Sequence, residues 1–254
     1  MDRDRGGPGA VADPIEAAVA EVRARIRAAC ERVGRDPGGV LLVAASKGVS
    51  IERMRLVAAA GVADFGENYA RELAAKAPRV EATWHFIGRL QRGTAAVVAQ
   101  HAEVVHSGVP GHGLERLSRH AQRIGRSVRC LVQVDETGRR QGVAPEDVPA
   151  LVPWASTFTG IRMVGLMTLP AFTGDPESAR PSFVRLRELR DKLRRTWPEL
   201  RELSMGMSVD YEVATEEGAT MVRVGSALFG ARPAGAPGGP GGPREAQGSG
   251  HSVP

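Results

Sequence analysis

Several features that assign a chain to a common class are scarce in this sequence. No apolar run approaches the roughly 18 residues of a membrane-spanning helix, and residues 1–13 lack the apolar core of a signal peptide. The two cysteines, Cys30 and Cys130, are too few for a disulfide framework or a metal site, and both fall in apolar patterns. We therefore expect a cytoplasmic protein in which both cysteines are small core residues.

Aromatic residues make up only 4% of the chain, which leaves little material for stacking nucleic-acid bases. The net charge of +5 could suit a polyanion. However, the positive residues are interleaved with Glu and Asp in helical patterns, as in residues 185–195. We interpret them as solvated helix faces and expect neither nucleic acid nor membrane among the partners.

Lysine is rare as well. The chain carries 34 lysine and arginine residues, and lysine occurs only at Lys47, Lys76 and Lys192. Arginine therefore serves wherever a plain positive charge suffices. Lys76 and Lys192 fall in amphipathic helical patterns and need no special role, which leaves Lys47 to be explained.

Composition divides the chain into three parts. Residues 1–12 are Gly-rich and charged, and residues 234–254 form a Gly/Pro-rich tail; neither can bury enough apolar surface to fold. Both are predicted to be disordered. Residues 13–233 are predicted to form one folded domain.

Short apolar runs alternate with helical patterns throughout this domain. Runs that are apolar throughout are typical of parallel strands covered on both faces. Eight of them separated by helices predict a single α/β domain, a (β/α)8 TIM barrel, with a doubly wound open sheet as the alternative. No Gly-rich dinucleotide turn follows the first run, which disfavours the open sheet. The expected strands are Val40–Ala45, Asp64–Gly66, Trp84–Ile87, Val104–His106, Val128–Val134, Met163–Leu166, Glu202–Ser204 and Met221–Val224.

The function of such a barrel lies at the carboxyl ends of its strands. Lys47 follows the first strand, where partial desolvation of its ammonium would lower the pKa and give an amine able to form an imine with an aldehyde. Arginine cannot do this chemistry. The alternative is a lysine that extends from the barrel rim into water.

The seventh and eighth strands end in segments rich in Gly and Ser, residues 204–208 and 225–226. Glycine lets backbone N–H groups approach an anion, and Ser208 precedes a predicted helix at residues 210–217. Phosphate sites in these barrels recur at this pair of loops. The alternative is that the segments are simply tight turns.

An imine-forming lysine opposite a phosphate site indicates pyridoxal 5′-phosphate (PLP), the commonest phosphorylated aldehyde cofactor. Arg223, on the eighth strand, is then placed to face the nitrogen of the pyridine ring. Because arginine keeps its proton, it disfavours protonation of that nitrogen and makes the ring a weaker electron sink.

At this point the residues match a known family. The chain resembles the YggS/PROSC-type pyridoxal phosphate homeostasis proteins in the segments 41–47 (LLVAASK), 65–69 (FGENY), 84–91 (WHFIGRLQ), 164–168 (VGLMT), 203–208 (LSMGMS) and 221–232 (MVRVGSALFGAR). The resemblance implies a barrel like the N-terminal domain of alanine racemase (PLP fold type III) with PLP bound as a Schiff base on Lys47. The residues expected to bind the cofactor are Lys47, Asn68, Met167, Ser204, Met207, Ser208, Arg223, Gly225 and Ser226.

Members of this family have no established catalytic reaction, and the resemblance implies a protein that holds, buffers or hands on PLP. We expect a monomer that makes transient contact with PLP-dependent apoenzymes. The alternative is a racemase or decarboxylase of the same fold type. A barrel of this size leaves no second domain to supply an opposing acid or base, and His85 is interpreted as a hydrogen-bonded core residue.

The sequence departs from the family pattern in two places. Gly93 and Thr94 stand where the family usually has an Asn-Lys pair. Arg140 stands in the loop after the fifth strand, where lysine is common. If that lysine forms a second imine, Arg140 cannot replace it, which puts direct transfer of the cofactor from this loop in doubt.

Overall fold

The structure is a computed structural model that describes residues 13–138, 141–171 and 174–230. The predicted terminal segments 1–12 and 234–254 therefore lie outside the described residues, as do Arg140 and the last three residues of the predicted domain.

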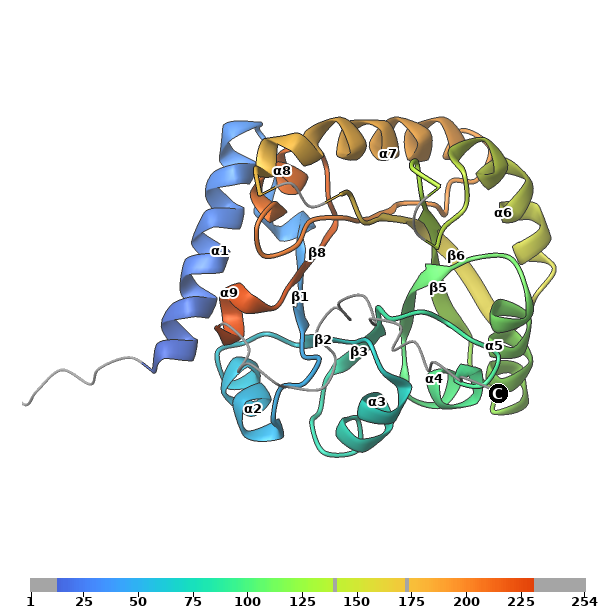
Figure 1. The fold of residues 1–254 in the computed structure, drawn as a ribbon, viewed down its shortest axis with the longest axis horizontal. Coiled ribbons are helices and arrows are strands. Elements are labelled where there is room, and N and C mark those ends of the chain that lie inside the picture. The colour runs from blue at the N-terminus through green and yellow to red at the C-terminus, as the bar shows by residue number, and fades with distance from the viewer. Residues whose placement is uncertain (1–12, 139–140, 172–173, 231–254) are drawn as a thin grey trace, which may run out of the picture.

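Eight parallel strands form a closed barrel in which each strand pairs with the next in the chain and β8 pairs with β1 (Figure 1). This confirms the predicted (β/α)8 barrel and rules out the open sheet. The strands are β1 (Leu41–Ala45), β2 (Asp64–Glu67), β3 (Thr83–Phe86), β4 (Val104–Gly108), β5 (Val128–Val134), β6 (Ile161–Thr168), β7 (Glu202–Ser204) and β8 (Met221–Val224).

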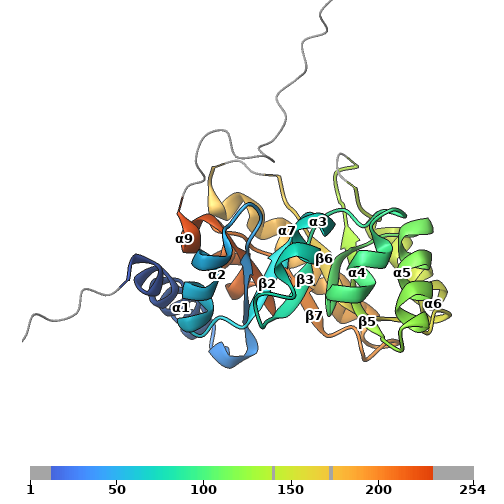
Figure 2. The ribbon, with the colours of Figure 1, turned by 90° about the horizontal axis from the view of Figure 1, so that it is seen from below.

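A helix follows every strand and lies on the outside of the barrel, while one further helix, α1, precedes β1 (Figure 1). Figure 2 shows α1 at one end of the molecule, next to α2 and α9. None of the helices that the structure describes is long and apolar enough to cross a membrane. The helices are α1 (Pro14–Arg32), α2 (Ile51–Ala59), α3 (Ala70–Lys76), α4 (Ala95–His101), α5 (His112–Arg123), α6 (Val148–Ser156), α7 (Arg180–Leu193), α8 (Tyr211–Glu216) and α9 (Ser226–Phe229), with short 3-10 turns at Pro37–Gly39, Pro145–Asp147 and Pro176–Ala179.

Helix α1 shows how local sequence sets an element's limits. The Asp13 carboxylate accepts a hydrogen bond from the N–H of Ile15 at 2.8 Å, and Pro14 occupies the first helical position. After the last turn, Gly34 adopts a φ of +66°, which ends the helix at low cost.

Strand β6 is longer than the strand predicted from the sequence, which covered only the apolar run 163–166. Its ends pair with both ends of the seven-residue β5, Ile161 with Val128 and Thr168 with Val134. Strand pairing therefore extends β6 beyond its most apolar residues, and Thr168 becomes part of the barrel wall.

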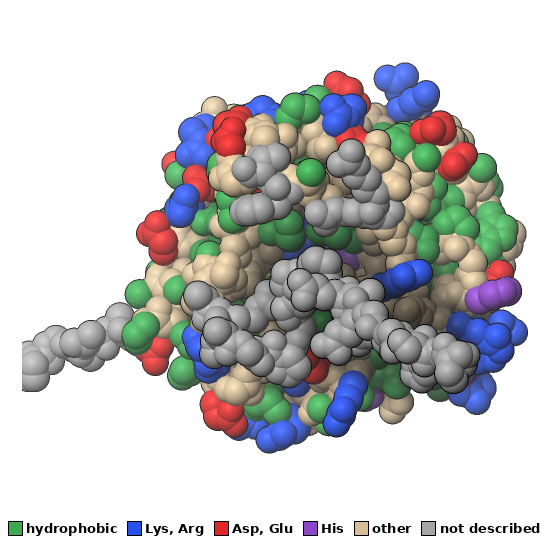
Figure 3. Space-filling model, in the orientation of Figure 1, with side chains coloured by type: hydrophobic (Ala, Val, Ile, Leu, Met, Phe, Trp, Pro, Cys, Tyr) green, Lys and Arg blue, Asp and Glu red, His purple; other side chains and the backbone are tan. Residues whose placement is uncertain are grey.

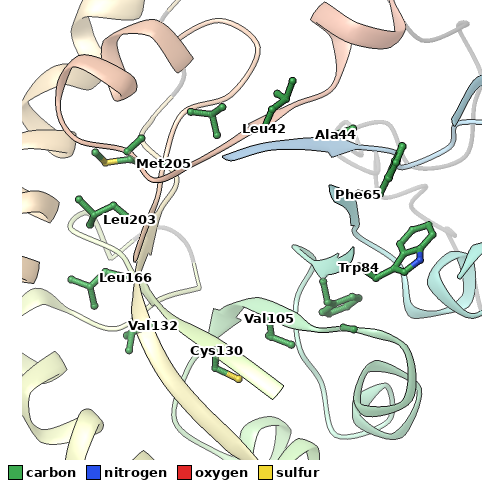
Figure 4. Close-up of a cluster of buried hydrophobic side chains, with 14 of the residues drawn as sticks. Leu42, Ala44, Phe65, Trp84, Val105, Cys130, Val132, Leu166, Leu203 and Met205 are labelled. Atoms are coloured by element: carbon green, nitrogen blue, oxygen red, sulfur yellow. The ribbon is translucent and has the colours of Figure 1, made fainter. Parts of the chain in front are cut away.

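Residues along each strand alternate between the two faces of the barrel wall. Outward-facing side chains such as Leu42, Phe65 and Leu166 pack against the helices in one large apolar cluster (Figure 4). Inward-facing side chains form a separate small cluster that includes Leu131 and Met167. The same alternation places polar side chains of β3, β4, β7 and β8 inside the barrel, where they reach the functional site.

Candidate functional site

A cavity of about 380 Å³ opens at the carboxyl ends of the strands. The space-filling view is hollowed near its centre, inside the ring of helices (Figure 3). The cavity is lined by Ala45, Lys47, Val49, Asn68, Ile87, Met167, Leu169, Met207, Ser208, Val209, Asp210, Arg223, Gly225, Ser226, Phe229 and Gly230. Eight of the nine residues predicted to bind the cofactor are in this set. The ninth, Ser204, lies behind the cavity wall, where it contacts Arg223.

Lys47 lies in the turn after β1 and is partly buried. Its Nζ is 5.9 Å from the centre of the Tyr69 ring, within the range of a cation–π contact. The Glu72 carboxylate accepts a hydrogen bond of 2.8 Å from the N–H of Gly48, the residue that follows the lysine. Burial opposes ionisation of Glu72, but hydrogen bonds from Lys76 and Gly48 and the charge of Lys47 hold its pKa below the ordinary value.

Lys76 corrects an expectation drawn from the sequence, because it is not a solvated helix residue. Its side chain is buried, and its Nζ donates hydrogen bonds to the Ser46 carbonyl at 2.9 Å, to Glu67 at 2.7 Å and to Glu72 at 2.6 Å. The ammonium therefore joins Ser46, the residue before Lys47, to the end of β2 and to helix α3.

The loops after β7 and β8 meet at Ser208. The Ser208 hydroxyl oxygen accepts hydrogen bonds from the N–H of Gly225 at 3.0 Å and the N–H of Ala227 at 3.4 Å. Two backbone donors thus converge on one oxygen at the cavity wall, as an anion site requires.

Asp210 is a residue of the cavity that the sequence did not single out. Helix α8 begins at Tyr211, one residue later than predicted, and the Asp210 carboxylate accepts a 2.6 Å hydrogen bond from the N–H of Met207. Burial raises the pKa of Asp210, although the bond from Met207 and the charge of Arg223 act against that shift.

Arg223 is buried in the barrel with its guanidinium at the cavity. It donates one hydrogen bond to the Thr168 carbonyl at 3.0 Å and another to the Ser204 hydroxyl. Burial lowers the pKa of Arg223 to about 10, opposed by the charge of Asp210, so the group is a cation at neutral pH.

Asn68 reaches the cavity because β2 and β3 approach each other closely at their ends. A Cβ on Gly88 would lie 1.8 Å from the Asn68 carbonyl oxygen, so only glycine fits there. The apolar cavity residues Ile87 and Leu169 also follow strand ends directly. They were missed because neither carries a polar group that marks it from the sequence, and the family resemblance supplied only Met167 and Met207 among the apolar cavity residues.

His85 is fully buried and hydrogen-bonded, as predicted for a core histidine. Within the described residues, no group of three or more His, Cys, Asp or Glu side chains could hold a metal ion.

The fold and the cavity define a class: a (β/α)8 barrel with a lysine at the end of its first strand, of the alanine racemase N-terminal domain type. The model of that family, "Alanine racemase, N-terminal domain", matches residues 18–233. A pyridoxal phosphate homeostasis protein from Pseudomonas aeruginosa is 41% identical over 224 residues, which cover 86% of this chain and 96% of the relative. Its counterpart in Aquifex aeolicus is 37% identical over 220 residues, covering 84% and 96%. The chain belongs to the pyridoxal phosphate homeostasis protein family, as the sequence predicted.

Solved structures agree with this assignment. PipY of Synechococcus elongatus, solved with PLP bound, is 33% identical with a TM-score of 0.75 and covers 85% of this chain and 100% of PipY. Alanine racemase of Clostridium difficile, 14% identical with a TM-score of 0.69, shares the fold over 87% of this chain and 61% of the racemase.

Proposed function

We propose that this protein holds PLP as a Schiff base on Lys47 and takes part in intracellular PLP homeostasis without catalytic turnover. One observation carries the proposal. An amine, Lys47, and a pair of converging N–H groups, those of Gly225 and Ala227, lie at the ends of adjacent strands around one cavity.

The donor set fits PLP in its chemistry. When bound, PLP supplies an aldehyde that accepts an amine, a phosphate and an electron-withdrawing pyridine ring. Lys47 provides the amine, and the loops after β7 and β8 provide neutral donors for a phosphate. The cavity of about 380 Å³ also carries the guanidinium of Arg223.

Each of these groups, side chain or backbone, has one role in the proposal. Lys47 anchors the ligand, and the N–H groups around Ser208 orient its phosphate. Arg223 presents a fixed hydrogen-bond donor toward the ring and keeps its proton at neutral pH. Apolar residues such as Ile87 and Leu169 exclude water from the ring.

A racemase or decarboxylase is less well supported. The titratable side chains on the described cavity wall are Lys47, Asp210 and Arg223. Tyr211 is buried away from it beside Arg25, whose guanidinium lies 5.7 Å from the ring centre. A two-sided proton transfer needs an acid and a base on opposite ring faces. The relatives are also named as homeostasis proteins and not as enzymes.

The finer parts of the proposal concern the setting of the protein. We propose a cytoplasmic monomer that contacts PLP-dependent apoenzymes transiently. The names of the relatives and the PLP-bound PipY structure support the ligand. The location, the oligomeric state and the apoenzyme contacts stand as proposals.

Borohydride reduction tests the Schiff base. Protein loaded with PLP is reduced, digested and examined by mass spectrometry, with the adduct expected on Lys47. Lys47→Ala should lose the adduct, while Lys192→Ala, which removes an exposed helical lysine, should keep it. An adduct that persists in Lys47→Ala would overturn the assignment. Multiple turnovers of any amino acid in a panel would favour the enzyme.

A further inference from the structure

Five polar side chains form one continuous line of hydrogen bonds inside the barrel. Arg223 donates to the Ser204 hydroxyl, whose oxygen lies 2.7 Å from Nδ1 of His106. Nε2 of His106 lies 2.8 Å from Nδ1 of His85, and Nε2 of His85 lies 3.0 Å from the Asp64 carboxylate. The line therefore joins β8, β7, β4, β3 and β2 in turn.

The chemistry of the two ends fixes the direction of the terminal bonds, and a single proton on each histidine ring gives the bonds between them the same direction. A carboxylate only accepts, so His85 donates from Nε2 to Asp64, and a neutral His85 then accepts at Nδ1. His106 accordingly donates from Nε2 and accepts at Nδ1 from the Ser204 hydroxyl. The Ser204 oxygen accepts from Arg223, which can only donate. Both ends require the same direction.

Burial disfavours a charge on His106, in the middle of this line. His85, His106 and Ser204 are fully buried. Burial is the main cause that lowers the pKa of His106 well below its ordinary value, and the charges of Arg223 and Arg129 act in the same direction. The neutral His106 ring thus has one donor and one acceptor nitrogen.

The line runs from one end of the barrel to the other. Arg223 lies at the cavity formed by the carboxyl ends of the strands. Asp64 is the first residue of β2 and lines a second cavity, of about 370 Å³, at the amino-terminal end of the barrel. Among the described residues, no carboxylate is hydrogen-bonded to Arg223 directly. Asp64 is the acceptor that ends its line.

We propose that Asp64, His85, His106 and Ser204 are positioning residues that hold Arg223 in one orientation through a one-directional hydrogen-bond chain. The proposal rests on the proposed function, since its effect is read on bound PLP. It assigns a role in PLP binding to Asp64, which lies outside the cofactor cavity.

Histidine tautomers test the chain without any cofactor. Long-range 1H–15N spectra of the ligand-free protein at pH 7.5 should show His85 and His106 as single tautomers protonated at Nε2. Asp64→Asn, which offers an N–H donor as well as an acceptor, should leave both histidines as tautomer mixtures. A proton on Nδ1 of His106 in the unsubstituted protein would overturn the proposal, whether or not PLP binds.

The effect on the cofactor is measured in the same variant. Asp64→Asn should shift the absorbance maximum of bound PLP or its pH profile, and raise the dissociation constant about tenfold, while borohydride still fixes PLP to Lys47. Ser118→Ala removes another buried hydroxyl, on α5, and serves as the control. Spectra and affinity equal to those of the control would overturn the positioning role. Loss of the Lys47 adduct from the unsubstituted protein would instead refute the proposed function and leave the tautomer result standing.

Discussion

The ammonium of Lys76 lies 2.7 Å from Oε1 of Glu67, and both side chains are buried. Burial raises the pKa of Glu67, while the hydrogen bond and the charge of Lys76 act in the opposite direction. Removal of one partner of such a pair leaves an uncompensated buried charge.

Lys76→Met should therefore lower the free energy of unfolding by about 3 kcal/mol in urea denaturation. Lys192→Met, at an exposed position of α7, should change it by less than about 0.5 kcal/mol. Adding Glu67→Gln to Lys76→Met should restore part of the loss, because the amide carries no charge. Equal stabilities of Lys76→Met and Lys192→Met would contradict this account.

His106 predicts a pH dependence of stability whose sign follows from its burial. Its folded pKa is lowered, so below the ordinary value of about 6.5 the unfolded chain binds a proton that the folded chain does not. Stability should therefore fall as the pH decreases through about 6.5, by up to about 1.4 kcal/mol per pH unit.

The measurement is a series of urea titrations between about pH 7.5 and pH 5.5, above the range in which ordinary carboxylates titrate. In His106→Asn the free energy of unfolding should change less steeply with pH than in the unsubstituted protein. His112→Asn, at a largely exposed position, should keep the original slope. An unchanged slope in His106→Asn would show that His106 is protonated in the folded state.

Gly88→Ala tests the close approach that positions Asn68. The added Cβ would lie 1.8 Å from the Asn68 carbonyl, so the ends of β2 and β3 have to move apart. We expect a loss of about 1–3 kcal/mol in stability, measured by denaturation, together with weaker PLP binding. Gly93→Ala, which meets nothing within 4 Å, is the matched control and should match the unsubstituted protein.

Gly225→Glu tests the phosphate contact. A side chain at this position points toward Ala45, whose carbonyl oxygen is 3.3 Å from the ideal Cβ, and a carboxylate there repels phosphate. PLP retention after gel filtration should fall at least tenfold. Gly39→Glu adds the same charge at an exposed site with nothing within 4 Å, and should leave retention unchanged. Equal retention in both variants would remove Gly225 from the phosphate site.

Sequence reasoning placed Lys47 and Arg223 correctly on the fold, because apolar runs locate strands and a barrel gathers the carboxyl ends of its strands in one place. It recognised His85 as a core residue but did not find His106 as its partner. The two are 21 positions apart, and their contact depends on the register and packing of β3 and β4 inside the barrel. Lys76 was missed because the seven residues of α3 give too short a pattern to show which face is buried.

The Ser208 hydroxyl gives the two loops a bonding partner that belongs to the protein itself. An incoming phosphate has to compete with this oxygen for the N–H groups of Gly225 and Ala227. When the phosphate departs, the hydroxyl can satisfy them again, so release does not leave these partly buried donors without an acceptor. In the proposed function, this internal acceptor stabilises the ligand-free loops and therefore favours reversible binding of the ligand.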